Sequence, residues 1–156
     1  MSRAASTGVT GSADGQSGVD SPTNGRALYF AGPEAVRIEP EAVPDPGPEE
    51  VLVETRVSAV SSGTELLIYR GEIPRNLPAD ETIDALAGDL TYPLKYGYAT
   101  VGEVAVVGTN VDDDWQGRTV FAFNPHESRF VADPATLVPV PDDVSPATAA
   151  LLPTAE

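Results

Sequence analysis

The stretch YPLKYGYATVGEVAVVGTNV, residues 92–111, has glycines at 97, 102 and 108 among apolar and β-branched residues. Valine, threonine and tyrosine are enriched in strands, so the stretch predicts two strands. A glycine inside a strand marks a bend or a point where another backbone approaches closely. We therefore expect Gly97 and Gly102 to be such points, and Gly108 to lie in a turn.

Other strands are predicted on both sides of this stretch. In VLVETRVSAV, residues 51–60, the side chains alternate with a period of two, which is typical of a strand. One set is Val51, Val53, Thr55 and Val57, and the other is Leu52, Glu54 and Arg56. ALYFAGPEAVRIEP, residues 27–40, has two apolar runs around Gly32-Pro33 and predicts a hairpin. GRTVFAF (117–123), SRFVADP (128–134) and TLVPVP (136–141) predict three more strands. Many short strands favour a mainly β fold, with a partly open barrel as its closure.

Three segments predict short helices. SSGTELLIYRG, residues 61–71, indicates a turn entering a helix, with Ser61, Ser62 or Thr64 as its cap. LPADETIDALAGD, residues 77–89, predicts a surface helix that ends at a glycine. VSPATAALLPTAE, residues 144–156, begins like a helix with Ser145 as cap and Pro146 at the first position. We interpret residues 145–156 as the start of a linker helix toward further protein.

The N-terminal segment differs in composition from the rest. Residues 1–25 are rich in Gly, Ser, Ala and Asp and nearly lack large apolar side chains, which predicts a disordered tail before a folded domain at 26–144. Of the chain's 24 acidic and nine basic residues, two of each lie in residues 1–26, so the folded part carries the formal net charge of -15. That charge argues against nucleic-acid binding. With a single lysine, it favours a halophilic source over the alternative, an acidic binding surface.

Other sequence features exclude several classes of site and location. The chain has no cysteine, so disulfides and thiolate metal sites are excluded. No apolar run reaches the roughly 18 residues of a membrane span, and the N-terminus has no apolar signal core. We therefore expect a cytoplasmic protein with no membrane partner.

The spacing from Gly97 through Gly102 and Gly108 to Val111 resembles the signature of zinc-type alcohol dehydrogenases. These belong to the medium-chain dehydrogenase/reductase superfamily. VSAVSSGTELLIYRGE (57–72) resembles the family's catalytic turn, and GRTVFAF and LVPVPDDVSPATAALL (137–152) resemble later elements in the expected order. SSGTE, YPL and the GY before VGEV look most like the bacteriochlorophyllide (hydroxyethyl) dehydrogenase branch, whose members oxidise a hydroxyethyl side chain with NAD. The resemblance covers residues 27–156.

The resemblance implies a GroES-like β-barrel domain that lacks the family's Rossmann domain. No Gly-x-Gly-x-x-Gly occurs in the chain, so NAD or NADP would bind through a Rossmann domain outside it, for example on a separate polypeptide. The family's zinc ligands do not match either. The ligand Cys falls on Ser62, the ligand His on Tyr98 and the adjoining Glu on Ala99, while the third ligand position lies near Pro153 or Glu156. Hydroxyls are poor substitutes for thiolate and imidazole, so we expect no catalytic zinc.

A zinc-free dehydrogenase would use the hydroxyls and the one histidine that the sequence offers. Thr64 matches the family's proton-shuttling hydroxyl, and Ser62 and Tyr98 place hydroxyls where the metal would be, with Tyr98 as donor to a carbonyl oxygen. His126 is the ready general acid or base. The alternatives are a packed Tyr98 with a satisfied hydroxyl, turn and cap roles for Ser62 and Thr64, and an exposed or core-satisfied His126. Glu65 matches the family's aspartate, or is a solvated carboxylate at a helix start.

Two classes of function follow from this resemblance. In the first, the chain is the catalytic, substrate-binding domain of a zinc-independent NAD(P)-dependent oxidoreductase, truncated or split from its nucleotide-binding half. It would act on a small-molecule alcohol or carbonyl compound and would not be active alone. In the second, it is a non-catalytic GroES-like binding or interaction module of dehydrogenase ancestry. A frameshifted remnant is a third interpretation.

Overall fold

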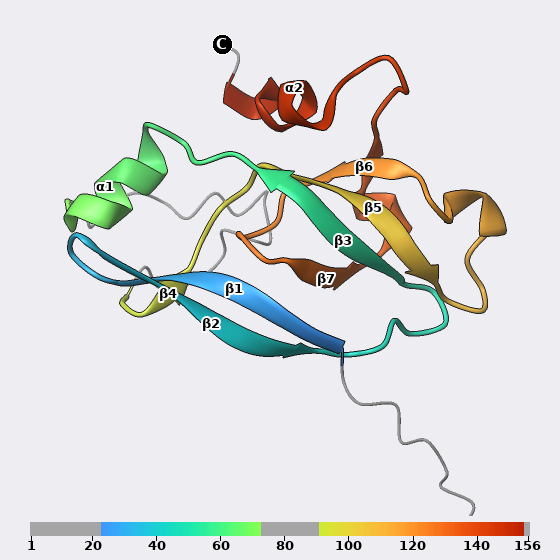
Figure 1. The fold of residues 1–156 in the computed structure, drawn as a ribbon, viewed down its shortest axis with the longest axis horizontal. Helices are drawn as coiled ribbons and strands as arrows, with labels where there is room; N and C mark the ends of the chain where they lie inside the picture. Colours follow the sequence, from blue (N-terminus) through green and yellow to red (C-terminus); the bar gives the residue numbers. More distant parts are fainter. Residues whose placement is uncertain (1–22, 73–90, 155–156) are drawn as a thin grey trace, which may run out of the picture.

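The computed structural model describes residues 23–72 and 91–154, whose strands form two antiparallel sheets (Figure 1). The smaller sheet has the order β2-β1-β4, and the larger has the order β7-β3-β5-β6-β8. The strands are β1 (Thr23–Gly32), β2 (Ala35–Val43), β3 (Val51–Ser58), β4 (Leu94–Lys95), β5 (Thr100–Val107), β6 (Thr119–Ala122), β7 (Arg129–Ala132) and β8 (Val138–Pro139). The mainly β, GroES-like fold is confirmed.

The first hairpin forms as the apolar runs around Gly32-Pro33 predict. β1 and β2 pair along their lengths, and Glu34 in the connection has a left-handed φ of 56°. One boundary was wrong: β1 begins at Thr23, so residues 23–25 of the expected tail belong to a strand paired with residues 41–43. The rest of that tail, residues 1–22, and the helix expected at 77–89 lie outside the described residues.

Two of the three glycines are points where backbones meet. Gly102 in β5 faces β3 so closely that a Cβ atom there would lie 2.5 Å from the Glu54 carbonyl oxygen. At Gly108 a Cβ atom would lie 2.1 Å from the Gly47 carbonyl oxygen. The Gly108 carbonyl also accepts from the Val111 amide at 3.0 Å, which closes the predicted turn. Both expectations are confirmed, because neither site has room for a side chain.

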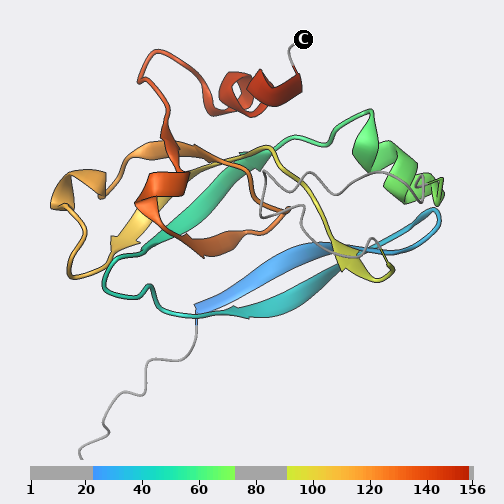
Figure 2. The ribbon, with the colours of Figure 1, turned by 180° about the vertical axis from the view of Figure 1, so that it is seen from behind.

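The helices are short and lie outside the sheets. They are α1 (Thr64–Arg70) and α2 (Pro146–Ala150), with 3₁₀ turns η2 (Asp113–Trp115), η3 (Pro134–Thr136) and η4 (Leu152–Thr154). The Ser145 side chain accepts from the Thr148 amide at 3.1 Å and Pro146 is the first residue of α2, as predicted. Figure 2 shows α2 lying over the larger sheet, where its two terminal alanines pack against Val101 and Phe121. Within residues 23–72 and 91–154, no helix is long and apolar enough to cross a membrane.

Residues 126–128 connect the two sheets. The Leu28 amide of β1 donates to the His126 carbonyl at 2.9 Å, and the Ser128 amide donates to the Arg26 carbonyl at 2.8 Å. On its other side the Ser128 carbonyl accepts from the Thr55 amide of β3 at 2.9 Å. The segment that carries the single histidine therefore closes the space between β1 and β3.

The chain's one lysine ties the smaller sheet to this same segment. The Lys95 ammonium lies 2.8 Å from Glu41 of β2 and 2.5 Å from Glu127, with 29% of its side chain exposed. Burial lowers the pKa of Lys95, but hydrogen bonds and charge attraction from Glu127 and Glu41 outweigh it, so the pKa is raised above its ordinary 10.5. The ion pairs therefore stabilise the folded state.

Replacing Lys95 with Met is expected to lower the free energy of unfolding by about 1–2 kcal/mol, because two partly buried carboxylates lose their cation. A raised folded pKa gives stability that is complete below pH 10.5 and is lost as pH rises through the folded pKa. The difference between Lys95→Met and wild type should therefore shrink above that pH in urea denaturation.

The control for this prediction is Arg37→Met, which removes an ion pair to Glu39 whose side chains are 56% and 43% exposed. An exposed pair contributes about 0–1 kcal/mol. Equal losses in the two variants, or a Lys95→Met loss that grows above pH 10.5, would contradict the stabilising role of Lys95.

Candidate active site

The turn before α1 carries two of the predicted catalytic hydroxyls. Ser62 is exposed, and Thr64 is the half-buried first residue of the helix. The helix cap differs from the prediction: its N-cap is Gly63, with no side-chain capping bond, so Ser61, Ser62 and Thr64 do not cap it. The Ser61 hydroxyl instead accepts from the Gly63 amide at 3.2 Å, which uses it inside the turn. Gly71 ends the helix in a left-handed conformation.

Tyr98 lies in the extended segment between β4 and β5. Its half-buried ring makes an edge contact with Tyr96, with centroids 6.3 Å apart, and packs against two apolar clusters. The Ala59 amide donates to the Ala99 carbonyl at 2.9 Å. This bond joins the segment after β3, which leads to Ser62, to the segment that carries Tyr98.

The predicted hydroxyls differ from their neighbours in hydrogen bonding. Thr55 donates to the Glu127 carbonyl at 2.6 Å, and Thr100 donates to the Asn124 carbonyl at 3.1 Å. Within the described parts of the chain, the hydroxyls of Ser62, Thr64 and Tyr98 make no hydrogen bond. The Tyr98 ring is packed, and its hydroxyl has no hydrogen-bond partner among the described residues.

His126 is buried, with 8% of its surface exposed, and both ring nitrogens are engaged. Nδ1 lies 2.8 Å from the Ser58 hydroxyl, and Nε2 lies 2.5 Å from a Glu65 carboxylate oxygen. This is the arrangement of a core histidine with satisfied nitrogens, the alternative to a ready acid or base. His126 therefore differs from Ser62, Thr64 and Tyr98: both of its ring nitrogens have partners, whereas their hydroxyls have none among the described residues.

Glu65 has a different environment from the solvated one considered for a helix-start carboxylate. It is 1% exposed, and its second carboxylate oxygen accepts from the Ser61 amide. Local sequence placed it correctly in the first turn of a helix, but its partner His126 lies 61 positions away. A buried acid paired with the only histidine is the element that the sequence prediction missed.

The ring of His126 packs against Gly97, which has no side chain to obstruct it. A Cβ atom at Gly97 would lie 2.9 Å from His126 Nε2, and the residue has a φ of 139° that side chains rarely adopt. The imidazole thus packs directly on the backbone that precedes Tyr98. The close approach predicted at Gly97 is confirmed, and the group that approaches it is the side chain of His126.

The donor set does not fit the family's zinc. By the resemblance, two of its ligand positions fall on the hydroxyl residues Ser62 and Tyr98, and Ala99, which follows Tyr98, is buried and has no side-chain donor atom. Serine and tyrosine hydroxyls are not zinc ligands in ordinary protein sites. Among the residues that the structure describes, no group of three or more His, Cys, Asp or Glu could hold a metal ion.

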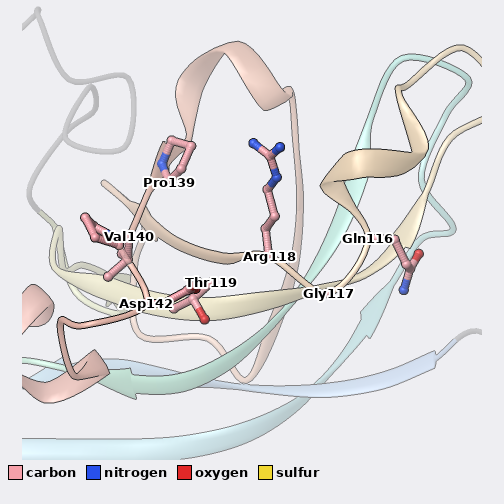
Figure 3. Close-up of a pocket in the computed structure, with 8 residues that line it drawn as sticks. Gln116, Gly117, Arg118, Thr119, Pro139, Val140 and Asp142 are labelled. Carbon is pink, nitrogen blue, oxygen red and sulfur yellow. The ribbon is translucent and has the colours of Figure 1, made fainter.

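The described residues form several surface hollows. One of about 390 Å³ lies beside Ser58 and His126 and is lined by residues of β1, β2 and β3 and by residues 126–128. Figure 3 shows a second, of about 360 Å³, between β6 and β8. Its cation, Arg118, lies over the Trp115 ring at 5.4 Å. Neither hollow is lined by Ser62, Thr64 or Tyr98.

Comparison with known proteins finds dehydrogenases similar to this chain in sequence and in fold. No protein-family model matches the chain. It is 32% identical over 79 residues to the 2-desacetyl-2-hydroxyethyl bacteriochlorophyllide A dehydrogenase of Rhodobacter capsulatus, a match that covers 51% of this chain and 22% of that protein. The chain thus spans less than a quarter of the curated relative's length.

Solved structures share the fold. The 2R,3R-butanediol dehydrogenase of Bacillus subtilis superposes with a TM-score of 0.62 at 21% identity, covering 82% of this chain and 44% of that one. An alcohol dehydrogenase of Escherichia coli CFT073, solved with NADH, gives a TM-score of 0.62 at 16% identity, covering 83% of this chain and 42% of that one. Each aligns with less than half of the solved enzyme.

Proposed function

Because the chain is related to the medium-chain dehydrogenase/reductase superfamily, through its hydroxyethyl bacteriochlorophyllide dehydrogenase branch, we propose that it is the catalytic, substrate-binding domain of a zinc-independent NAD(P)-dependent oxidoreductase. Its substrate would be a small-molecule alcohol or carbonyl compound. The observation that supports this most is that Ser62, Thr64 and Tyr98 have hydroxyls without partners among the described residues, at positions that the family resemblance assigns to metal ligands and a proton-shuttling hydroxyl.

The proposed chemistry needs a donor for developing negative charge. When a carbonyl is reduced its oxygen gains charge, and a positioned hydroxyl donating to that oxygen lowers the barrier. Tyr98 would be this donor, with its ring orientation fixed by contact with Tyr96. Thr64 would pass the proton to or from the substrate oxygen, and Ser62 would orient the substrate. A bound nicotinamide would supply or accept the hydride.

The nucleotide would be held by other residues. The chain has no Gly-x-Gly-x-x-Gly turn, the backbone feature that lets a dinucleotide pyrophosphate approach a helix N-terminus. We therefore place the Rossmann half on a separate polypeptide or segment. Leu151 and Leu152, which follow α2, are 56% and 63% exposed and support the docking of another domain at this end of the fold.

The proposal is tested by reconstitution. The chain is expressed and mixed with the Rossmann-domain polypeptide encoded nearest to it. NAD(P)H absorbance is then followed with primary and secondary alcohols, including a hydroxyethyl chlorin. We expect turnover from the pair, none from either half, and no loss after dialysis against a chelator. Absence of both turnover and nucleotide binding in the pair would favour the alternative, a non-catalytic interaction module. Stoichiometric zinc in the purified chain would overturn the zinc-independent mechanism.

The cytoplasmic location and the halophilic source stay predictions. The location rests on the lack of an apolar signal core or membrane-length apolar run in the sequence, and the halophilic source rests on the net charge of -15 with one lysine. In the described part of the chain the lysine is already engaged by two carboxylates, so the acidic surface has only arginines left to balance it.

A further inference from the structure

We propose that Glu65 and His126 are positioning residues, which fix the turn of Ser62 and Thr64 against the segment of Tyr98. A catalytic role for these two residues rests on the proposed function. The structural claim, that one rigid polar cluster joins three distant segments of the chain, does not rest on it. The cluster consists of the side chains of Ser58, Glu65 and His126, the Ser61 amide and the Gly97 backbone.

Glu65 is the centre of the cluster. One of its carboxylate oxygens lies 2.5 Å from His126 Nε2, and the other accepts from the Ser61 amide. An ionised carboxylate only accepts hydrogen bonds, so the proposal assigns the ring hydrogen to Nε2. The Glu65 side chain is 1% exposed, so these two bonds replace water as the partners of its charge.

His126 is held from several directions. In the neutral ring with hydrogen on Nε2, Nδ1 is an acceptor, so the Ser58 hydroxyl at 2.8 Å donates to it. Its backbone carbonyl accepts from the Leu28 amide at 2.9 Å. The ring therefore has a fixed tautomer and a fixed orientation relative to β1 and β3.

The same ring determines where the Tyr98 segment lies. It packs against Gly97, at which a Cβ atom would come within 2.9 Å of Nε2. The imidazole is thus between the carboxylate that holds the Ser61–Gly63 turn and the backbone that leads into Tyr98. A displacement of either segment would leave a buried charge without its partner, which is strongly unfavourable.

The chain's single histidine makes the test direct, because a histidine-labelled sample shows one pair of ring nitrogens. We expect ¹⁵N NMR to show the Nε2–H tautomer with a slowly exchanging proton. In Glu65→Gln, the amide oxygen keeps the Ser61 bond and the amide nitrogen donates to Nε2, so the ring should switch to Nδ1–H. The control Glu103→Gln, at an exposed carboxylate paired with Arg56, should leave the tautomer unchanged.

A second measurement reports on the turn itself. Removal of the carboxylate in Glu65→Ala should speed hydrogen exchange of the Ser61 amide at least about tenfold. Ser58→Ala removes the other ring contact and should leave that amide protected. A ring that averages between tautomers in the wild type, or the same tautomer in wild type and Glu65→Gln, would overturn the proposal. If Glu65→Ala does not fold, the Glu65→Gln tautomer still decides.

Kinetics of the reconstituted enzyme separate positioning from mere stability. Glu65→Asp, one methylene shorter, should lower kcat by roughly 10–100-fold with little change in the KM for nucleotide, because misplacement of about 1 Å costs on that scale. Glu65→Gln should recover part of that loss. Equal kcat in wild type and Glu65→Asp would contradict positioning. A wild-type pair without turnover would refute the proposed function, while the tautomer experiment would still test the cluster.

Discussion

Replacing Gly108 with Ala is expected to lower the free energy of unfolding by about 3 kcal/mol, the upper range for overpacking. The added methyl group would lie 2.1 Å from the Gly47 carbonyl oxygen and 2.5 Å from the Pro48 carbonyl oxygen. Both are backbone atoms and cannot move away by changing rotamer. The methyl group would also strain the bond from the Gly108 amide to the Glu50 carbonyl, now 2.8 Å. Urea denaturation followed by fluorescence of the single tryptophan measures the loss.

The matched control is Gly32→Ala at the end of β1, where a Cβ atom would meet no atom within 4 Å. A substitution in open space changes stability by about 0.5 kcal/mol or less. Similar losses at both positions would indicate that glycine flexibility in general matters, and would contradict the close approach at Gly108. Unchanged stability of Gly108→Ala would do the same.

Replacing Tyr98 with Phe is expected to lower kcat/KM of the reconstituted enzyme by about 100-fold, the usual effect of removing one hydrogen-bond donor from a developing oxyanion. The ring and its edge contact with Tyr96 are retained, and the hydroxyl has no partner among the described residues, so folding stability should change little. Steady-state kinetics of carbonyl reduction and thermal unfolding are measured on the same preparation.

The control for this variant is Tyr29→Phe in β1, a tyrosine of the smaller sheet beside Glu41 and Lys95. It should leave kcat/KM within about twofold. A Tyr98→Phe enzyme of wild-type activity would remove Tyr98 from the proposed chemistry. A loss of the same size in Tyr29→Phe would mean that tyrosine hydroxyls act through stability of the barrel and not through the substrate.

Local sequence patterns predicted the elements whose causes are local. The alternation in residues 51–60 predicted β3, in which Val51 and Val53 on one face belong to a core cluster. Gly32-Pro33 predicted the first hairpin, and Ser145 with Pro146 predicted the start of α2. In each case the residues that determine the structure lie within a few positions of it. The resemblance to dehydrogenases added the GroES-like fold, which no local pattern contains.

The cluster around Glu65 could not be predicted in this way. Its members come from β3, α1, the segment before β5 and the loop before β7, and the pair of Glu65 and His126 spans 61 positions. An acidic residue in the first turn of a helix gives the same sequence pattern whether the helix start is exposed or buried. The pattern at Glu65 therefore could not distinguish a solvated carboxylate from a buried one. The cap was wrong for a related reason: the Ser61 hydroxyl bonds within the turn, so Gly63 occupies the N-cap. The available signal was a lone histidine beside a proline in the loop between two predicted strands.

The attachment of residues 126–128 to β1 also bears on how the domain opens. A terminal hairpin such as β1–β2 would ordinarily be a candidate for independent fraying. Here its separation would break the amide bonds from Leu28 and Ser128 and would admit water to the imidazole of His126. We therefore expect the hairpin to open together with the polar cluster, as one cooperative unit.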